Sequence, residues 1–419
     1  MRSTRSGLVL LLIAFLGPRD ALAQQDEGDM PPAERAYVAS KIDSAIETYF
    51  AHREGVPDLD LDAAYKDYLD SALRANGRYG FDMATLEFVA RLRNKHTQFD
   101  DPWLVRTHGQ PLGFSAIEVE GKWAILWSRD GRLKPGDVVR AIDGVAVEAF
   151  VRDQRRFVAA SSDRAARSLV FDRPYLFPRR FTLELEDGRK FAIERERQDE
   201  PPAREEPRRA SEGRWLDEGR VGYLRIPSFN DTNYEKTAIE FVRTYRDARC
   251  LIVDVRGNGG GGTPWGLIGE LMDREWRGWT TTTPVVVALD RARGAQAARI
   301  QTESGRFQPR AGAFAGRLLL LVDRSCCSAC EDFVMPFKEN GRAQIVGETT
   351  EGSSGQPFFL RLPGGMALMV GAERHRFPDG TAFESIGITP TIPVERRLDD
   401  LRMGVDTLLE KARELAAAP

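Results

Sequence analysis

Two short, mostly apolar runs set the strongest limit on how this chain can fold. The first is Cys250-Leu-Ile-Val-Asp-Val255, and the second is Leu318-Leu-Leu-Leu-Val-Asp323. Because their residues do not alternate between apolar and polar, these runs are typical of strands buried on both faces, as in parallel sheets. A glycine-rich turn follows the first run, and a helical segment over residues 329–340 follows the second. This order predicts an α/β fold in which helices cover the faces of the sheet.

The alternation of strand and helix continues on both sides of these runs. Residues 221–226 and 343–347 are expected to be strands, and residues 233–247 an amphipathic helix. We therefore predict an α/β core over residues 217–397, followed by a C-terminal helix over residues 398–419.

The first half of the chain has a different organisation, since 419 residues exceed what one hydrophobic core usually holds. Apolar residues recur at three- and four-residue steps in segments 37–50 and 83–92, which predicts an N-terminal helical domain over residues 30–104. Short β-type runs separated by Gly and Asp turns fill residues 105–198. Residues 199–216 are dense in charge and proline, which is typical of a linker.

The N-terminus has the pattern of a cleaved secretory signal over residues 1–23. Arg2 and Arg5 precede the apolar run 7–16, which is too short to span a bilayer as a helix. Ala21-Leu-Ala23 then supplies small residues at the spacing of a signal-peptidase site. The alternative, an uncleaved membrane anchor, is disfavoured because Pro18-Arg19-Asp20 interrupts the run. We therefore expect export, to a periplasm or outright by secretion, and no membrane-spanning segment in the mature chain.

Charge and residue spacing exclude several classes of partner. The 60 Lys and Arg residues nearly balance the 63 Asp and Glu residues, for a net charge of -3, and form no basic stripe that would indicate nucleic acid as a partner. His, Cys and acidic residues have no spacing that fits a closed metal site, so we expect no metal and no organic cofactor.

Three of the four cysteines crowd into the segment after the second buried run. They are Cys326, Cys327 and Cys330, whereas Cys250 starts the first run. A disulfide between the adjacent pair would close a strained ring. We therefore interpret the three residues as small buried side chains that fill a tight turn.

Ser328 lies where the second buried run turns into a helix. Unpaired backbone N–H groups and the dipole at a helix N-terminus favour developing negative charge there, so a serine at this place can serve as a nucleophile. The alternative is that Ser328 caps the helix, which is the commonest role of serine at such a site. Glu331, three residues on, is expected to complete a capping box.

The glycine turn Asp254-Val-Arg-Gly-Asn-Gly-Gly-Gly-Gly262 favours the catalytic alternative. Its glycines allow the backbone to approach a ligand closely and to present N–H groups to it. We predict an oxyanion hole formed near Gly259, Gly260 and Ala329. A phosphate-binding loop is excluded because Gly262 is followed by Thr263-Pro264 rather than by Lys and Ser or Thr.

Five blocks in this order together resemble the C-terminal-processing (tail-specific) serine peptidase family, which includes the tricorn core protease. They are the strand 221–229, the glycine turn, Ser328-Ala-Cys-Glu331, Val346-Gly-Glu348 and Gly387-Ile-Thr-Pro390. The resemblance covers residues 30–397 and implies a crotonase/ClpP-like catalytic core. Residues 131–144, with turns at Pro135-Gly136 and Asp143-Gly144, resemble part of a PDZ domain. Residues 105–198 are therefore expected to be a PDZ-like module that holds an extended peptide, or else a β-rich lid or spacer.

The resemblance also separates two possible bases for Ser328. The processing branch has a Lys twenty-five positions after the nucleophile, but position 353 of this chain is Ser. The tricorn-like branch instead has a His in a short N-terminal segment and a Glu near the C-terminal Gly-x-Gly-x-x-Pro motif. Lys95-His96-Thr97 and Glu384 occupy these places, which implies that His96 is the base and that Glu384 orients its ring. Lys95 is expected to depress the pKa of His96.

Two further residues enter the predicted site. His375 lies between two arginines and is the rival base, but we expect it to be exposed or to face a substrate carboxylate. Gln356 belongs to a loop expected at the mouth of the cleft and is a candidate for binding substrate.

The sequence thus predicts an exported serine-type peptidase that hydrolyses peptides or unfolded proteins through an acyl-enzyme on Ser328. Two alternatives stay open. One is a non-catalytic binding protein on the same scaffold, which the missing Lys would suit. The other is a hydrolase of a non-peptide acyl group.

Overall fold

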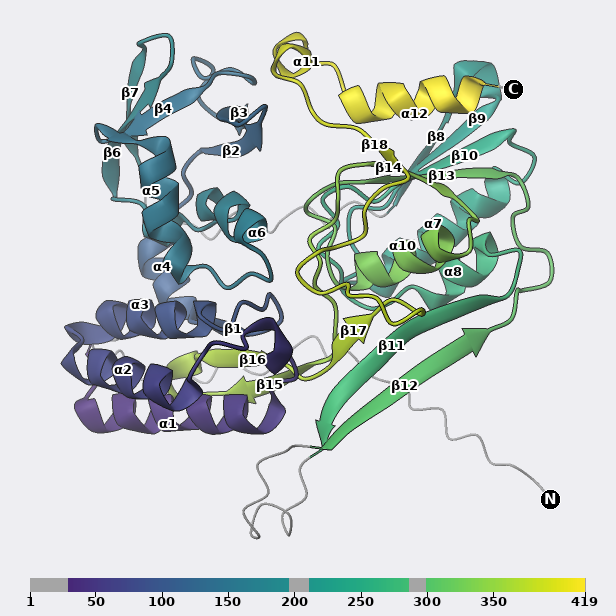
Figure 1. Ribbon diagram of the computed structural model, residues 1–419. Coiled ribbons are helices and arrows are strands. Elements are labelled where there is room, and N and C mark those ends of the chain that lie inside the picture. The colour runs from purple at the N-terminus through teal and green to yellow at the C-terminus, as the bar shows by residue number, and fades with distance from the viewer. Residues whose placement is uncertain (1–28, 196–210, 286–298, 419) are drawn as a thin grey trace, which may run out of the picture.

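The computed structural model describes residues 29–195, 211–285 and 299–418 (Figure 1). The fold is mixed α/β. The helices of the N-terminal segment and a β-rich module lie on one side of the molecule, and a large core built on a parallel sheet lies on the other (Figure 1). None of the helices in these described ranges is both long enough and apolar enough to cross a membrane.

The core is organised around a six-stranded sheet. The strands β9, β10, β13, β14 and β18 pair in parallel, and β8 pairs antiparallel to β9 at one edge. The order across the sheet is β18 (Ile392–Pro393), β14 (Gln344–Gly347), β13 (Arg317–Val322), β10 (Cys250–Asp254), β9 (Val221–Arg225) and β8 (Glu212–Leu216). Every residue of β10 is buried, as expected for a central strand with both faces covered.

Helices cover both faces of this sheet. Three helices pack on one face, and they are α7 (Thr232–Thr244), α8 (Trp265–Leu271) and α10 (Ala329–Glu339). The helix α12 (Thr407–Ala417) packs on the other, where Leu408 and Ala412 join the apolar side chains of β10, β13 and β14. The strands and helices predicted for the core agree with these elements to within a few residues.

Parts of the predicted domain division differ from the structure. Residues 212–216, predicted to belong to the charged linker, form strand β8, because their backbone pairs with β9 in register. The predicted C-terminal helix is two helices, α11 (Leu398–Met403) and α12, since Gly404 ends α11 in the left-handed conformation with φ 68°. The predicted signal segment 1–23 and the rest of the predicted linker, up to residue 210, lie outside the described residues.

A strand that follows the N-terminal helices forms a sheet with a hairpin from near the end of the chain. The helices are α1 (Pro32–Tyr49), α2 (Leu61–Arg74) and α3 (Gly77–Ala90), followed by the short α4 (Pro102–His108). Strand β1 (Gln98–Asp100) pairs antiparallel with β16 (Ala367–Gly371), which pairs in turn with β15 (Pro357–Arg361). Leu368 and Val370 of β16 join the hydrophobic core of the helices. The helical region is therefore completed by residues far along the chain.

The β-rich module follows α4 in the chain. It contains β2 (Phe114–Val119), β3 (Lys122–Ser128), β4 (Val139–Ile142), β5 (Val145–Ala146), β6 (Arg180–Leu185) and β7 (Lys190–Glu194), with helices α5 (Val147–Gln154) and α6 (Asp163–Ser168). The predicted turn Asp143-Gly144 joins β4 to β5, and both residues have positive φ (49° and 77°), as a tight hairpin turn requires.

A long ribbon extends along the lower side of the core in Figure 1. Its strands are β11 (Trp276–Val285) and β12 (Arg299–Phe307), and the short β17 (Arg374–Arg376) pairs with β11. We did not predict this ribbon. Its segments contain Gly278, Pro284 and Gly305, residues that weaken the pattern of a strand.

Candidate active site

The backbone of Ser328 has the conformation of an exposed nucleophile. Ser328 has φ 58° and ψ -128° at the start of α10, a region that costs a non-glycine residue about 1–3 kcal/mol. Its amide donates to the Ser353 carbonyl at 2.8 Å, and its own carbonyl accepts from Glu331 N at 2.7 Å. Its side chain makes no capping hydrogen bond, so the helix-cap interpretation is wrong. The turn resembles the strained strand-to-helix elbow that presents a catalytic hydroxyl.

His96 meets this hydroxyl from the opposite end of the chain. Its Nε2 lies 3.0 Å from Ser328 Oγ, although 232 positions separate the two residues. The loop between α3 and β1 carries His96, and it is fixed where Thr97 Oγ1 accepts from the amide of Gly371 at 3.1 Å. Pairing of β1 with β16 thus places the histidine against the nucleophile.

The surroundings of His96 keep its ring neutral. The ring is buried, and burial lowers the pKa of His96 to about 3, with further lowering by the charges of His375 and Lys95. The expected effect of Lys95 therefore has the predicted direction, although burial is the larger cause. The Lys95 ammonium itself pairs with Glu351 at 3.2 Å. A neutral imidazole has the free lone pair that a general base needs.

The side chain in contact with Nδ1 of His96 is Ser353 rather than Glu384. Nδ1 of His96 lies 2.9 Å from Ser353 Oγ. For Nε2 to accept the proton of Ser328, Nδ1 must carry the ring hydrogen and donate it to Ser353. Ser353 stands at the position where the processing branch of the resembled family has its Lys. The serine that replaces the expected Lys base at position 353 is thus the hydrogen-bond partner of the alternative base, His96.

Glu384 lies one layer further from the nucleophile. Among the described residues its carboxylate makes no bond with His96. It accepts from His375 N at 3.4 Å and from the amide of Ser354, and its Oε2 lies 3.8 Å from His52 Nδ1. Burial raises the pKa of Glu384 well above its usual range. The predicted contact fails because Ser353 occupies the position at Nδ1, so Glu384 acts on the neighbouring peptide of the same loop.

Glu331 holds the loop that carries Ser353. Its carboxylate accepts from the amides of Gly352 at 2.8 Å and Ser353 at 2.9 Å, and it also bonds to the Thr350 hydroxyl. Burial raises the pKa of Glu331 to about 8. The predicted capping box is wrong, because the amide of Ser328 is already used by Ser353 O. The sequence contains no signal for this role, since it depends on a loop twenty residues away.

Two backbone amides are free to bind a developing oxyanion. Those of Gly259 and Ala329 have no acceptor within the described residues. The amide of Gly260 donates to Asn258 Oδ1 at 2.9 Å, so its predicted role as a donor is not supported by the contacts. Gly260 instead provides space, since a Cβ there would lie 2.7 Å from Ser328 Cβ and 2.9 Å from Ala329 N. Its φ of 99° also favours glycine.

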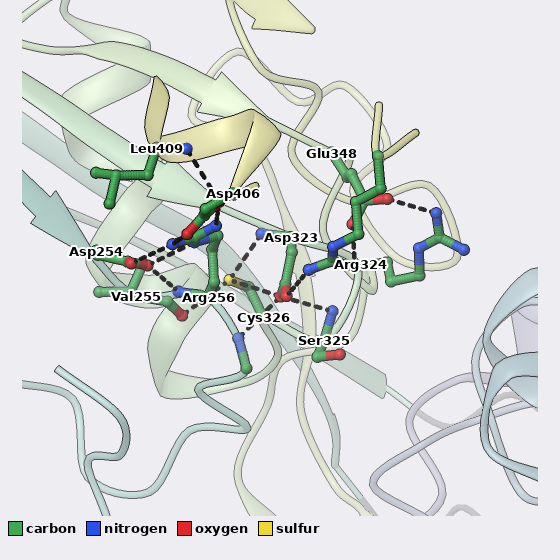
Figure 2. Close-up of polar contacts among 12 residues, drawn as sticks. Asp254, Val255, Arg256, Asp323, Arg324, Ser325, Cys326, Glu348, Asp406 and Leu409 are labelled. Carbon is green, nitrogen blue, oxygen red and sulfur yellow. Dashed lines mark hydrogen bonds and ion pairs between the residues drawn. The ribbon is translucent and has the colours of Figure 1, made fainter. Parts of the chain in front are cut away.

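A network of charged groups fixes the turns on which the site is built (Figure 2). Asp323, at the end of β13, accepts from the amides of Gly257 at 2.9 Å and Ser325 at 3.1 Å, which joins the glycine turn to the nucleophile turn. Arg256 bonds to both Asp254 and Asp406, and so ties the glycine turn to the start of α12. Both turns that would form the oxyanion hole are therefore anchored at their bases.

Three of the four cysteines lie in or next to the nucleophile turn, and Cys250 starts β10. All four are buried and free. The thiol of Cys326 lies 3.2 Å from Val255 O, and that of Cys327 lies 3.4 Å from Ser353 O. Burial raises the pKa of both thiols well above the usual value, which keeps them protonated. The prediction that they are small buried residues of a tight turn is confirmed.

The rival base is placed differently from the prediction. His375 is buried rather than exposed, because its strand β17 lies under the ring of Trp279, at 5.5 Å between centroids. Its Nε2 lies 3.2 Å from Glu373 Oε1, and it makes no hydrogen bond with Ser328. Gln356 lines a cavity next to this histidine, which agrees with its expected place beside the cleft.

A third histidine joins the cluster without having been predicted. His52 is buried, and its Nε2 donates to Glu373 O at 3.0 Å. Burial lowers the pKa of His52 to about 3, with a smaller contribution from His96. Across the described parts of the chain, no group of three or more His, Cys, Asp and Glu side chains is placed to hold a metal ion.

Comparison with known proteins finds one family that resembles the core of the chain. Residues 220–394 match the model of peptidase family S41. Carboxyl-terminal-processing peptidase 2 of the Arabidopsis thaliana chloroplast is 25% identical over 359 residues, which cover 78% of this chain and 64% of that protein. The carboxyl-terminal-processing protease of Synechocystis sp. is 23% identical over 288 residues, covering 67% and 60%. The chain thus matches less than two thirds of the length of these relatives.

Solved structures share the fold across most of the described chain. Mature CPAF in complex with lactacystin superposes with a TM-score of 0.72 at 13% identity, covering 92% of this chain and 98% of that one. The D1 C-terminal processing protease of photosystem II gives a TM-score of 0.52 at 19% identity, covering 92% and 97%. The fold, the contact between Ser328 and His96, and the family match of the core all point to a serine peptidase. The core of the chain, residues 220–394, is thus similar to the serine peptidases of family S41.

Proposed function

We propose that the chain is an active serine peptidase that hydrolyses peptide bonds of peptides or unfolded proteins, with Ser328 as nucleophile and His96 as base. One observation carries the proposal: Ser328 Oγ lies 3.0 Å from Nε2 of a buried histidine whose pKa is lowered to about 3. At neutral pH this imidazole is unprotonated and in hydrogen-bond reach of the hydroxyl, as general-base catalysis requires.

The proposed reaction is acyl transfer through a covalent intermediate. Ser328 Oγ attacks the scissile carbonyl while His96 Nε2 takes its proton, and the oxyanion binds the amides of Gly259 and Ala329. The imidazolium then protonates the leaving amine, which departs. Water then attacks the acyl carbonyl while His96 takes its proton. The bond between the acyl carbon and Ser328 Oγ breaks, the acid product leaves, and the imidazolium returns the proton to Oγ. Throughout the reaction Ser353 Oγ accepts a hydrogen bond from Nδ1–H of His96, and this bond keeps Nε2 directed at the Ser328 hydroxyl.

Ser353 gives this site a different character from a triad with a carboxylate. A neutral hydroxyl stabilises the imidazolium less than an ionised acid would, because charge-assisted hydrogen bonds are about twice as strong. In compensation the hydroxyl is rigidly held, since Ser353 is fully buried and its amide is bonded to Glu331. We therefore assign Ser353 the positioning of His96, and assign Glu384 the support of the loop next to it.

The surrounding parts of the fold suit a peptide substrate. We propose that the core is of the crotonase/ClpP-like kind and that the β-rich module is PDZ-like, binding an extended segment of the substrate by adding it to a sheet edge. The module touches the catalytic turns directly: Arg164 donates to the carbonyls of Thr349 at 3.0 Å and Thr350 at 2.7 Å, and Arg324 donates to Glu118 O at 2.9 Å. These contacts favour a module that works with the site over an independent spacer.

We also propose that the protein is exported, to a periplasm in the first instance. The support is the sequence of residues 1–23, with its basic start, short apolar run and Ala21-Leu-Ala23. Fractionation of cells that express the full chain, with N-terminal sequencing of the product, tests this: a mature N-terminus at Gln24 in the exported fraction supports it, and an uncleaved chain in the cytoplasm contradicts it.

Labelling with a fluorophosphonate probe tests the catalytic proposal. Wild type should label, Ser328→Ala and His96→Ala should not, and His375→Ala should keep the labelling. The matched control is Ser325→Ala, which removes an exposed hydroxyl three residues before the nucleophile and should leave labelling intact. A wild type that does not label, or a Ser328→Ala variant that labels equally, contradicts the proposal.

The same assay separates the two candidates for orienting His96. Ser353→Ala leaves the Nδ1 hydrogen without an acceptor in a buried place, which costs about 1–3 kcal/mol and should slow labelling about ten- to a hundredfold. Glu384→Gln, which keeps an acceptor for Ser354 N, should slow it less. The reverse order would return Glu384 to the role that the sequence predicted.

A non-catalytic binding protein is the second candidate. The observation that favours it is the absence of an ionised partner at His96 Nδ1 together with Ser in place of Lys at position 353. An unlabelled wild type that still binds peptides would support this candidate.

A further inference from the structure

A cavity of about 280 Å³ lies between helix α10 and the ribbon β11–β12. Asp332 lines it and follows Ser328 by four residues on α10. Residues four apart lie on the same face of a helix, about 6 Å along its axis, so the cavity is within the reach of a substrate side chain. Asp332 is also linked to both catalytic loops, since its carboxylate accepts from Thr263 Oγ1 and from Ser354 Oγ, both at 2.7 Å.

Aromatic rings form one wall of this cavity. Trp276 and Phe307 stack at 4.1 Å between centroids, and Trp265 stacks on Phe307 at 5.3 Å. Trp265 is 55% exposed and Trp276 is buried, so the stack runs from the surface into the cavity. Trp279 lies on the other side, and its Nε1 donates to Asp332 Oδ1 at 2.8 Å. The walls therefore present ring faces, which carry negative electrostatic potential.

Two carboxylates complete the lining. The side chain of Asp332 is 16% exposed and that of Glu373 is 25% exposed. Burial raises the pKa of Glu373, but its hydrogen bonds with His375 and Thr281 together lower the pKa by a larger amount. The pKa therefore lies below its usual value, and the carboxylate is ionised at neutral pH. No Lys or Arg lines the cavity among the described residues. The one basic group in the described lining is the imidazole of His375, whose Nε2 lies 3.2 Å from Glu373 Oε1, so two carboxylates face a single imidazole.

We propose that this cavity is a specificity pocket that takes a basic side chain, Arg or Lys, of a substrate residue close to the scissile bond. The inference rests on the proposed function, because it needs Ser328 to be the site of cleavage. A guanidinium or ammonium would lie against the ring faces of Trp265 and Trp276, and its charge would meet Glu373 and Asp332. The volume is at the lower limit for ligand pockets and suits one side chain.

The alternative occupants fit less well. An apolar or aromatic side chain would remove water from the Glu373 carboxylate, which is ionised, without supplying an opposite charge, and the cost of that desolvation opposes the arrangement. An acidic side chain would be repelled by both carboxylates. Charge complementarity thus selects the cation.

The test compares peptides that differ at one position. A fixed sequence is varied to Arg, Lys, Gln, Glu and Phe at each of three positions on both sides of the cleaved bond, and kcat/KM is divided by the fraction of enzyme that a fluorophosphonate labels. One position should prefer Arg or Lys over Gln by about tenfold, the effect expected of a desolvated cation on aromatic faces beside a carboxylate. Glu373→Gln and Trp265→Ala should each reduce this preference several-fold.

Two control variants match these changes outside the cavity. Glu275→Gln removes the same charge from an exposed carboxylate that pairs with Arg306, and Trp215→Ala removes a half-exposed ring that packs on Tyr245. Both should keep the wild-type preference. A labelled enzyme that shows no preference for basic residues at any position, or that prefers Phe, overturns the inference and leaves the proposed function standing.

Binding to the inactive Ser328→Ala variant keeps the inference testable if wild type does not label. The cavity contains three tryptophans, so a bound cation should change their fluorescence. An Arg-containing peptide should bind about tenfold more tightly than its Gln counterpart, and Glu373→Gln should abolish the difference. Equal binding of the two peptides contradicts the pocket assignment whatever the outcome of the labelling.

Discussion

At the scale of single residues, the site depends on a histidine whose surroundings oppose its protonation. His96 and its neighbour His52 are both buried, and burial lowers the pKa of each to about 3. Ser328 is held with positive φ by the bond between its amide and Ser353 O, so the hydroxyl does not depend on a substrate to reach its place. The nucleophile and the base are thus arranged before substrate arrives, which reduces the reorganisation that the reaction requires.

The lowered pKa of His96 predicts an unusual pH dependence. The rate at which Ser328 reacts with a fluorophosphonate should stay nearly constant from pH 7.5 to pH 5, because the imidazole remains neutral until the pH approaches about 3. A histidine with an ordinary pKa near 6.5 would lose most of its neutral form over this range. A labelling rate that falls by half near pH 6.5 contradicts this prediction.

The same shift has a consequence for stability. The folded state keeps His96 and His52 neutral, whereas the unfolded chain protonates them below pH 6.5. Their contribution to stability is therefore present above pH 6.5 and is lost as the pH falls from 6.5 towards 3. Acid is expected to inactivate the protein by unfolding it before it titrates the base.

At the scale of elements, the N-terminal end of helix α10 organises the site. Ser328 immediately precedes the helix, Glu331 holds the loop 350–353, and Asp332 faces the cavity. The loop in turn supplies Ser353 to His96. One helix end thus sets the nucleophile, the partner of the base and the proposed pocket.

Replacing Glu331 with Ala should damage both the fold and the site. The change leaves the buried amides of Gly352 and Ser353 without their acceptor, and each unpaired group costs about 1–3 kcal/mol. We expect a lower Tm and a loss of fluorophosphonate labelling together. The control is Glu339→Ala at the exposed end of the same helix, which should change neither. A Glu331→Ala variant with unchanged labelling would show that the loop is held by other contacts.

Local sequence patterns were sufficient for the core elements, because apolar runs and turn residues report directly on strands and tight turns. For Ser328 the local pattern left a helix cap open, and the glycine turn and the family resemblance were needed to favour a nucleophile. His96 came from a family resemblance, and the structure brings it to Ser328. The role of Ser353 was missed and that of Glu384 was misplaced, because both depend on how the loop 350–353 folds against α10. The pairing of β1 with β16 was missed for a similar reason, since these strands come from distant segments. The ribbon β11–β12 was missed because Gly278, Pro284 and Gly305 weaken its strand pattern.

At the scale of the whole molecule, the β-rich module and the core meet at the catalytic turns. Arg164, from the helix α6 of the module, donates to the carbonyls of Thr349 and Thr350, next to the loop that carries Ser353. Arg324 of the core reaches back to Glu118 O in the module. A movement of the module is therefore expected to shift this loop and, through Ser353, the position of His96.

Removing the Arg164 side chain should loosen this contact. Arg164→Ala is expected to slow labelling of Ser328 several-fold and to increase cleavage between the module and the core by an added protease, while the helices of the core remain folded by circular dichroism. Arg152→Ala, on the exposed face of helix α5, is the matched control and should behave as wild type. If Arg164→Ala keeps both the labelling rate and the protease resistance, the module and the site are independent.

The pairing of β1 with β16 has a consequence for the time at which the protein becomes reactive. His96 precedes β1 by two residues, and the strand that fixes it ends at Gly371. A ribosome or an export channel that has released only the first 350 residues has already delivered both Ser328 and His96, but not the hairpin that brings them together. A partly synthesised or partly translocated chain therefore lacks a working base, and reactivity begins only when the last quarter of the chain has folded back onto the first.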